Sequence, residues 1–301
     1  MAGLRVLGAL IVAVAGCASA VPPAGTAPAT PRARLIADLT EALRRGAPDE
    51  AAAILDRARQ LPQAARPSES LVAYFDATVH SYRGDFRGAA EVLHDYTVRV
   101  GPTAQDAFAF HDAMIALRTA DGDLLGALVE CEEMVVAGTR GTWKPPGDDR
   151  MTWVRLKEHW HRAYLLRMIA QTRAGAERQA LIGYAERARR DYIAVAAPLH
   201  TLGDSIAVLD AYFAFCDGAR DAMRAAAQRV HADDDDIEDL YLVQLALDAG
   251  GAHDAAAAVR QRMAALDEAT ALTPVFLAWL QADAATAPPF RFSPRHPTAD
   301  R

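Results

Sequence analysis

Apolar residues recur at helical spacing after residue 33, and glycines divide them into pairs of helices. Leu35, Leu39 and Leu43 follow one another at steps of four, which is the spacing of one helix face. Gly46 predicts the end of this helix, because glycine readily takes the left-handed conformation that closes a helix. Asp49 predicts the cap of a second helix. That helix has an apolar set of its own: Ala52, Ile54, Leu55 and Ala58.

A five-residue step from glycine to alanine repeats along the chain. Three early copies have glycines 38 residues apart: Gly46–Ala51, Gly84–Ala89 and Gly122–Ala127. Positions further along these copies also correspond: Leu55 with Leu93 and Cys131, and Ala58 with Tyr96 and Met134. Later copies are more loosely spaced: Gly175–Ala180, Gly250–Ala255 and the poorer Gly218–Ala222. A period of roughly 33 to 42 residues with two helices per unit predicts an all-α fold, an α-solenoid of about six helical hairpins.

Helix-start signals agree with this division. Thr103-x-x-Asp106 and Thr201-x-x-Asp204 have the form of capping boxes before apolar runs. Thr273-Pro274 has a cap followed by a proline at the first helical position, which predicts a closing helix to about residue 285. We therefore expect a helical-repeat domain over residues 33–285 and a proline-rich, disordered tail over 286–301.

One hairpin has a more specific pattern. Tyr82-Arg83-Gly84-Asp85-Phe86-x-x-Ala89, followed by Leu93 and Pro102, resembles the tetratricopeptide repeat family. The tryptophan and the Leu-Gly pair of that family's first helix are missing. The resemblance implies a right-handed superhelical array with a concave groove that binds other proteins and carries out no catalysis.

The N-terminal sequence predicts export of the protein and its attachment to a membrane by a lipid. Arg5 precedes an apolar run, Val6–Ala15, that is half of the about 20 residues needed to span a bilayer. Val14-Ala15-Gly16-Cys17 then resembles the lipobox of bacterial lipoproteins. The resemblance implies a signal peptide over 1–16, a diacylglycerol group on the Cys17 sulfur and an acyl chain such as palmitate on its amino group. The alternative is an ordinary secretory signal cleaved at Ala18-Ser19-Ala20.

The segment after the cysteine, residues 17–32, is rich in alanine and proline and predicts a flexible tether. By the habit of the lipoprotein family, Ala18 after the cysteine implies the periplasmic face of the outer membrane. The lipid anchor would then be the protein's only contact with the membrane.

The repeat spacing is interrupted once. Gly122 and Gly175 lie 53 residues apart, and we place the excess in an insertion loop over residues 138–149. The helix expected after it, from Arg150 to Arg173, has Trp153, Trp160 and Tyr164 at steps that place them on one face. One interpretation is a partner-binding site: Trp143, Lys144, Trp153, Arg155, His159, Trp160 and Tyr164. The alternative is that the aromatic stripe is core and the loop is a spacer.

Composition and motifs indicate little chemistry. The net charge is −7 and no basic face stands out, so nucleic acid is not an expected partner. His159 and His161 lie about 200° apart on a helix and cannot share a metal ion. The acidic run 233–236 fits a helix N-terminus better than a calcium loop. Cys131 and Cys216 are expected to be free thiols. No cofactor, metal site or catalytic motif is predicted.

These patterns lead to a function of the binding class. We expect an envelope lipoprotein that acts as a non-catalytic scaffold for protein–protein interaction, as an accessory of an assembly, secretion or motility complex. The alternative is a small-ligand or peptidoglycan-binding module that uses the aromatic stripe near residues 143–164. The partner, the face that binds it and the oligomeric state are left open by the sequence.

Overall fold

The chain folds into helices. The computed structural model describes residues 30–143, 149–199, 203–230, 240, 243–244, 247–248 and 251–269. Over these ranges it contains eleven α-helices, one short 3-10 helix and no strand, which confirms the all-α prediction. None of the described helices is long and apolar enough to cross a membrane.

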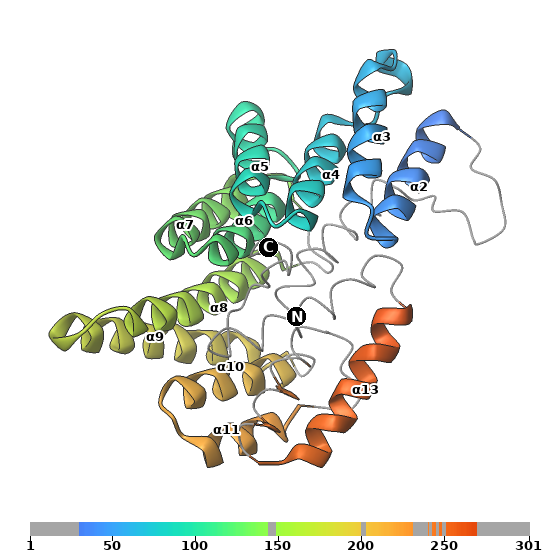
Figure 1. Cartoon of the computed structure of the whole chain (residues 1–301). Helices are drawn as coiled ribbons and strands as arrows, with labels where there is room; N and C mark the ends of the chain where they lie inside the picture. Colours follow the sequence, from blue (N-terminus) through green and yellow to red (C-terminus); the bar gives the residue numbers. More distant parts are fainter. Residues whose placement is uncertain are drawn as a thin grey trace.

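The helices succeed one another around an open arc (Figure 1). Their bounds are α2 Pro31–Arg44, α3 Pro48–Gln60, α4 Glu69–Tyr82, α5 Phe86–Val100, α6 Ala107–Asp121, α7 Leu124–Arg140, α8 Arg150–Gln171, α9 Gly175–Ala196, α10 Gly203–Cys216, α11 Arg220–Ala227 and α13 His253–Ala269; the 3-10 helix is Gln63–Ala65. From α3 to α8, each helix packs against the helix before it and the helix after it in the chain. α10 packs on α11 and reaches back to α8 and α9.

Left-handed glycines separate the helices of the early pairs. Gly46, Gly84 and Gly122 have φ values of 66°, 76° and 83°, a region in which a Cβ atom is costly. Each directly follows the last turn of a helix, as the sequence pattern predicted. The last described turn has its left-handed residue at Gly251, one position after Gly250, which lies outside the described residues.

Aspartates cap the second helix in two of these pairs. The Asp85 carboxylate accepts a hydrogen bond from the Gly88 amide at 2.9 Å, and Asp123 does the same for Gly126 at 2.9 Å. Asp49, expected to be a cap, is not one: α3 begins at Pro48, so Asp49 lies inside the first turn. Its carboxylate instead pairs with Arg83 of the next hairpin at 2.6 Å.

The capping box predicted at Thr103 is also absent from the structure. Asp106 itself stands at the N-cap of α6 and makes no capping bond, because its carboxylate accepts from the Tyr96 hydroxyl at 3.3 Å. The Thr103 carbonyl accepts from Thr142, 39 residues later. The signals at Thr201 and Thr273 lie outside the described residues.

The alanine five residues after each early glycine is a contact point between helices. Ala51, Ala89 and Ala127 are each 0% exposed, and a methyl group allows two helices to approach closely there. The matched positions Leu55, Leu93 and Cys131 are buried as well.

Later copies of the step are displaced. Five residues after Gly218 and Gly251 stand Met223 and Ala256, both buried. The expected Ala222 and Ala255 are exposed, one residue away from the packed position. In the α8–α9 pair the step fails, because Ala180 is exposed.

The domain limits differ slightly from the expected ones. α2 begins at Pro31, where the Thr30 hydroxyl accepts from the Ala33 amide, so the described helical region starts two residues before residue 33. The signal peptide over 1–16, the tether up to residue 29, the closing helix after 273 and the tail over 286–301 lie outside the described residues.

The excess length of the interrupted repeat lies partly in helices and partly in the segments that connect them. α7 continues to Arg140, so the segment between α7 and α8 begins at Gly141 and not at Gly138. α8 has 22 residues where α6 has 15, and this longer helix accounts for the largest part of the excess. Gly138 lies inside α7. Val154 and Phe108 pack against it in the space that a side chain would otherwise fill.

α6 lies between two apolar clusters. Phe110, Ala113 and Met114 belong to a cluster that extends back to α2. Phe108 and Ile115, on the other side of the same helix, belong to a cluster that extends forward to α13. α6 is therefore buried on two faces, and polar side chains on it have to find partners within the protein.

Candidate functional site

Two of the aromatic residues expected to bind a partner lie in the core. Trp160 and Tyr164 are 4% and 3% exposed. The Trp160 ring packs edge-on against Tyr164 at 6.5 Å and against Tyr192 of α9 at 5.3 Å between centroids. These side chains are packed between helices and present no surface to a partner.

The other described residues of that set differ in their exposure. Trp143 is half-buried and stacks on Phe108 of α6, with 4.0 Å between ring centroids. Trp153 is half-buried against the same cluster, Arg155 is exposed and His159 is half-buried. Lys144 and the lipidation candidate Cys17 lie outside the described residues.

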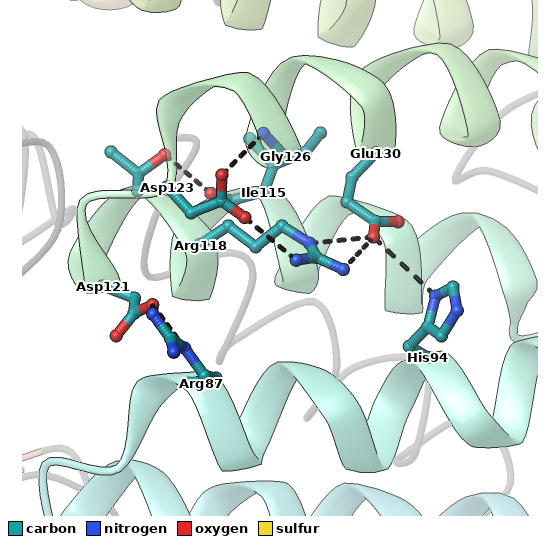
Figure 2. Close-up of polar contacts among 9 residues, drawn as sticks. Arg87, His94, Ile115, Arg118, Asp121, Asp123, Gly126 and Glu130 are labelled. Atoms are coloured by element: carbon teal, nitrogen blue, oxygen red, sulfur yellow. Dashed lines mark hydrogen bonds and ion pairs between the residues drawn. The ribbon is translucent and has the colours of Figure 1, made fainter.

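A buried carboxylate on α7 joins three helices, as Figure 2 shows. Glu130 accepts from the Arg118 guanidinium at 2.9 Å and lies 2.8 Å from His111 Nδ1, both on α6. Its other neighbour is His94 of α5, with Nδ1 3.9 Å away. Arg118 also donates to Asp123, the cap of α7, at 3.1 Å. We call these five residues the Glu130 cluster.

The electrostatics of this cluster favour a charged Glu130. Burial by itself would raise the pKa of Glu130, but the hydrogen bond with His111 and the positive charge of Arg118 outweigh it and hold that pKa below its usual value. The buried anion is therefore compensated by a permanent cation, which is the condition for a buried carboxylate to be tolerated.

A second buried cluster joins α6 to α8. Asp112 Oδ1 lies 2.6 Å from His161 Nε2, and Asp112 Oδ2 accepts from Lys157 Nζ at 2.8 Å. His161 Nδ1 lies 2.9 Å from the Tyr164 hydroxyl. A neutral imidazole protonated on Nε2 fits both contacts, since it donates to Asp112 and accepts from Tyr164. We call these four residues the Asp112 cluster.

The single carboxylate of Asp112 contacts two basic side chains, Lys157 and His161. Burial would raise the pKa of Asp112, but the Lys157 ammonium and the hydrogen bond from His161 outweigh it, and the pKa is lowered. Burial lowers the pKa of His161 despite the neighbouring Asp112. The charges balance with Asp112 ionised, Lys157 protonated and His161 neutral.

Both clusters use their polar atoms within the chain. The carboxylate oxygens of Glu130 and Asp112 are occupied by side chains of neighbouring helices. Within the described ranges no group of three His, Cys, Asp or Glu side chains is arranged to hold a metal ion. The contribution of the clusters is to hold α5, α6, α7 and α8 in a defined register.

The outer surface over the Glu130 cluster carries apolar side chains. Val98 of α5 is 68% exposed, and Leu125 and Val129 of α7 are 59% and 60% exposed. Leu125 and Val129 stand one turn apart and share a helix face that points away from Cys131 in the core. Exposed apolar residues at adjoining positions are a common mark of an interaction site.

Acidic side chains stand among these apolar residues. The exposed members are Glu91 and Asp95 on α5 and Glu133 on α7. We define the α5–α7 face as these three acids with His94, Val98, Leu125 and Val129. His94 connects its two halves, because it projects from α5 to Glu130 of α7 (Figure 2).

The arginines of α5 are already paired. Arg87 bonds Asp121 at the end of α6 at 3.0 Å, and Arg99 lies 3.1 Å from Glu69 at the start of α4. Arg140 is exposed at the C-terminal end of α7, well beyond the Leu125–Val129 pair. Arg87 also interacts electrostatically with Glu91, one turn away on α5, so the face combines apolar side chains with a partly compensated excess of acids.

The sequence pattern contained a signal for this face. Leu125 and Val129 are apolar, yet they lie on the side of the helix opposite the buried Ala127 and Cys131 positions. A helix with apolar residues on two sides presents more than one face to a partner.

No protein-family model, curated protein or solved structure matches this chain.

Proposed function

We propose that the protein is a lipid-anchored envelope protein whose helical body binds another protein without catalysing a reaction. The body is an α-solenoid of stacked helix pairs, similar to tetratricopeptide repeats, with a right-handed superhelical turn. The recurrence of a left-handed glycine followed by a fully buried alanine, at Gly46–Ala51, Gly84–Ala89 and Gly122–Ala127, is the observation that carries this proposal. Repeats that pack only on their chain neighbours leave their other faces open to partners.

The anchor is Cys17, lipidated after removal of residues 1–16. Each buried CH₂ group contributes about 0.8 kcal/mol to membrane binding, and more than one chain is needed for a stable hold. The first described helix begins at Pro31, so the 14 residues from Cys17 to Thr30 would reach at most about 50 Å from the membrane surface. The scaffold would serve an assembly, secretion or motility complex of the envelope.

Two measurements test this proposal. Cys17→Ser should release the protein from the membrane fraction and remove the mass of the lipid. A photo-crosslinking residue placed at position 56 on α3, 129 on α7 or 184 on α9 should capture a specific protein in the native envelope at one position at least. Retention of the Cys17→Ser protein in the membrane, or the absence of a protein adduct at all three positions, would contradict the proposal.

The second candidate, a sugar-binding or small-ligand module, loses its main support. Trp160 and Tyr164 are packed in the core, and Trp143 already stacks on Phe108. Aromatic platforms for sugars need an open ring face. We expect tryptophan fluorescence to stay constant when soluble peptidoglycan fragments are titrated, whereas a saturable shift would restore this candidate.

A further inference from the structure

We infer that the α5–α7 face binds a basic amphipathic helix of a partner protein. The inference rests on the proposed function, since it names the surface and the chemistry of the partner. It is carried by the exposed apolar residues, by the excess of acids among them and by the buried polar contacts beneath.

The apolar side chains provide the anchor points. Leu125 and Val129 are more than half exposed and stand one helical turn apart on α7, and Val98 is exposed on α5. An amphipathic helix presents its own apolar residues at steps of three and four, so its stripe matches a pair with this spacing. The described part of the chain contains no strand, and therefore no sheet edge on which an extended peptide could pair.

The negative charge around these apolar residues favours a positively charged partner. Glu91, Asp95 and Glu133 are exposed, and Glu91 interacts with Arg87 of the same helix. Arg87 and Arg99 are each paired with an acid of a neighbouring helix, so acids remain in excess on the face. A partner rich in lysine and arginine would therefore be attracted, and an acidic one repelled.

The support under the face is rigid. Glu130 is buried, forms hydrogen bonds with Arg118 and His111 of α6, and lies beside His94 of α5. Asp123, which caps α7, accepts a hydrogen bond from the same Arg118. Because α5 and α7 are held in place before a partner arrives, little ordering of the backbone is needed on binding.

The test measures binding of two synthetic helical peptides to the full chain carrying Cys17→Ser. Both have about 18 residues, which is five turns, and an identical leucine stripe; one has lysine and the other glutamate on its polar side. Fluorescence anisotropy should show saturable binding of the lysine peptide, weakening with added salt, and at least about tenfold weaker binding of the glutamate peptide. Equal binding of the two peptides would overturn the inference.

Matched variants locate the site. Glu91→Gln/Asp95→Asn/Glu133→Gln should weaken binding of the lysine peptide by about tenfold. Asp56→Asn/Glu177→Gln/Asp191→Asn, which removes the same charge elsewhere, should change it by less than about twofold. Leu125→Ser/Val129→Ser should also weaken it by about tenfold, and Tyr184→Ser should not. If the two charge variants behave alike, the face is not the site.

Other occupants of the face are outcomes of the same experiment. A peptide of residues 288–301, which contains Arg291 and Arg295, would displace the lysine peptide if the chain's own tail occupied the face. A second copy on the face would appear as a dimer in sedimentation that Leu125→Ser/Val129→Ser dissociates. Either result overturns the inference of an external partner. In the crosslinking experiment, an adduct at position 56 or 184 and none at 129 would do so too, while leaving the proposed scaffold function intact.

Discussion

His161 Nε2 lies 2.6 Å from Asp112 Oδ1, and this buried contact joins α8 to α6 across 49 residues of sequence. The same carboxylate holds Lys157 with its second oxygen. The groups that face His161 and Asp112 are Lys157 and Tyr164 of α8, Cys131 of α7 near Asp112, and Tyr212 of α10 near Tyr164. With Lys157 charged, protonation of His161 would leave a positive charge in the interior without a counterion.

The first prediction concerns the dependence of stability on pH. Burial lowers the pKa of His161 from 6.5, so on acidification the unfolded chain takes up the proton before the folded chain does. The free energy of unfolding should therefore fall as the pH drops below 6.5, with a slope of at most about 1.4 kcal/mol per pH unit from this group. The contribution of Asp112, whose pKa is lowered, is lost only at more acidic pH, below its ordinary value of 3.8.

Urea unfolding at pH 7.5, 6.5 and 5.5 measures this slope. His161→Gln should reduce it, while His159→Gln, at a half-buried position two residues away, should leave it unchanged. An identical slope in the His161→Gln protein would show that this histidine does not set the acid sensitivity.

The second prediction compares two glutamates of α7. Glu130→Gln removes the buried partner of Arg118 and His111 and should destabilise the fold by about 3 kcal/mol. Glu132→Gln removes an exposed partner of Arg162 and should cost less than about 1 kcal/mol. Chemical denaturation of both variants at pH 7.5 measures the difference, and equal losses would mean that the Glu130 cluster adds no more than a surface pair.

The third prediction uses two glycines inside helices. At Gly183 an added Cβ meets no atom within 4 Å, so Gly183→Ala should stabilise α9 by about 0.5–1 kcal/mol. At Gly138 the same atom would lie 2.5 Å from Val154 Cγ2 and 2.8 Å from Phe108, so Gly138→Ala should destabilise. Thermal unfolding should shift the melting temperature in opposite directions, and a shared direction would contradict the packing at Gly138.

The fourth prediction separates a true helix cap from its sequence counterpart. Asp85→Ala removes the hydrogen bond to the Gly88 amide and should cost about 1 kcal/mol. Asp49→Ala removes only an exposed ion pair with Arg83 and should cost less than about 0.5 kcal/mol. Urea unfolding measures the loss of unfolding free energy in the two variants. Equal losses would indicate that Asp49 acts as a cap after all.

The fifth prediction concerns the thiols. Burial raises the pKa of Cys131 to about 12, and the side chain is fully enclosed. In the Cys17→Ser protein, a thiol reagent should therefore leave Cys131 unmodified until urea unfolds the chain. Cys216 is half-buried and should react in the folded protein, slowly, since burial raises the pKa of this thiol as well. Mass spectrometry of peptides after timed labelling distinguishes the two residues, and rapid labelling of Cys131 would contradict its burial.

Local features of the fold followed from neighbouring residues in the chain. Gly84 takes a left-handed conformation and Asp85 caps the next helix, because both requirements are met by atoms within a few residues. The same holds for Asp149, which accepts from the Thr152 amide at the start of α8. Where the local signal failed at Asp49, the carboxylate is paired with Arg83 from the next pair of helices.

The candidate site depended on contacts that no local pattern contains. Trp160 and Leu125 both stand at helical spacing among apolar residues, yet Trp160 is enclosed by Tyr192 of the following helix and Leu125 is left outside. Which side of a helix is covered depends on where the next helices lie, and those are placed by residues tens of positions away. The buried carboxylates of Glu130 and Asp112 likewise have partners that lie 12 to 49 residues away.

The amino-acid sequence by itself thus determined the helices, the glycine turns and the alanine contacts of the early hairpins, because helix propensity, capping and backbone conformation are short-range effects. The packing of the assembled helices determined that α8 carries the largest share of the extra length, that Trp160 and Tyr164 face inward and that the α5–α7 face remains open. Burial is a property of the whole arrangement of helices, and a one-dimensional pattern of apolar residues is compatible with more than one such arrangement.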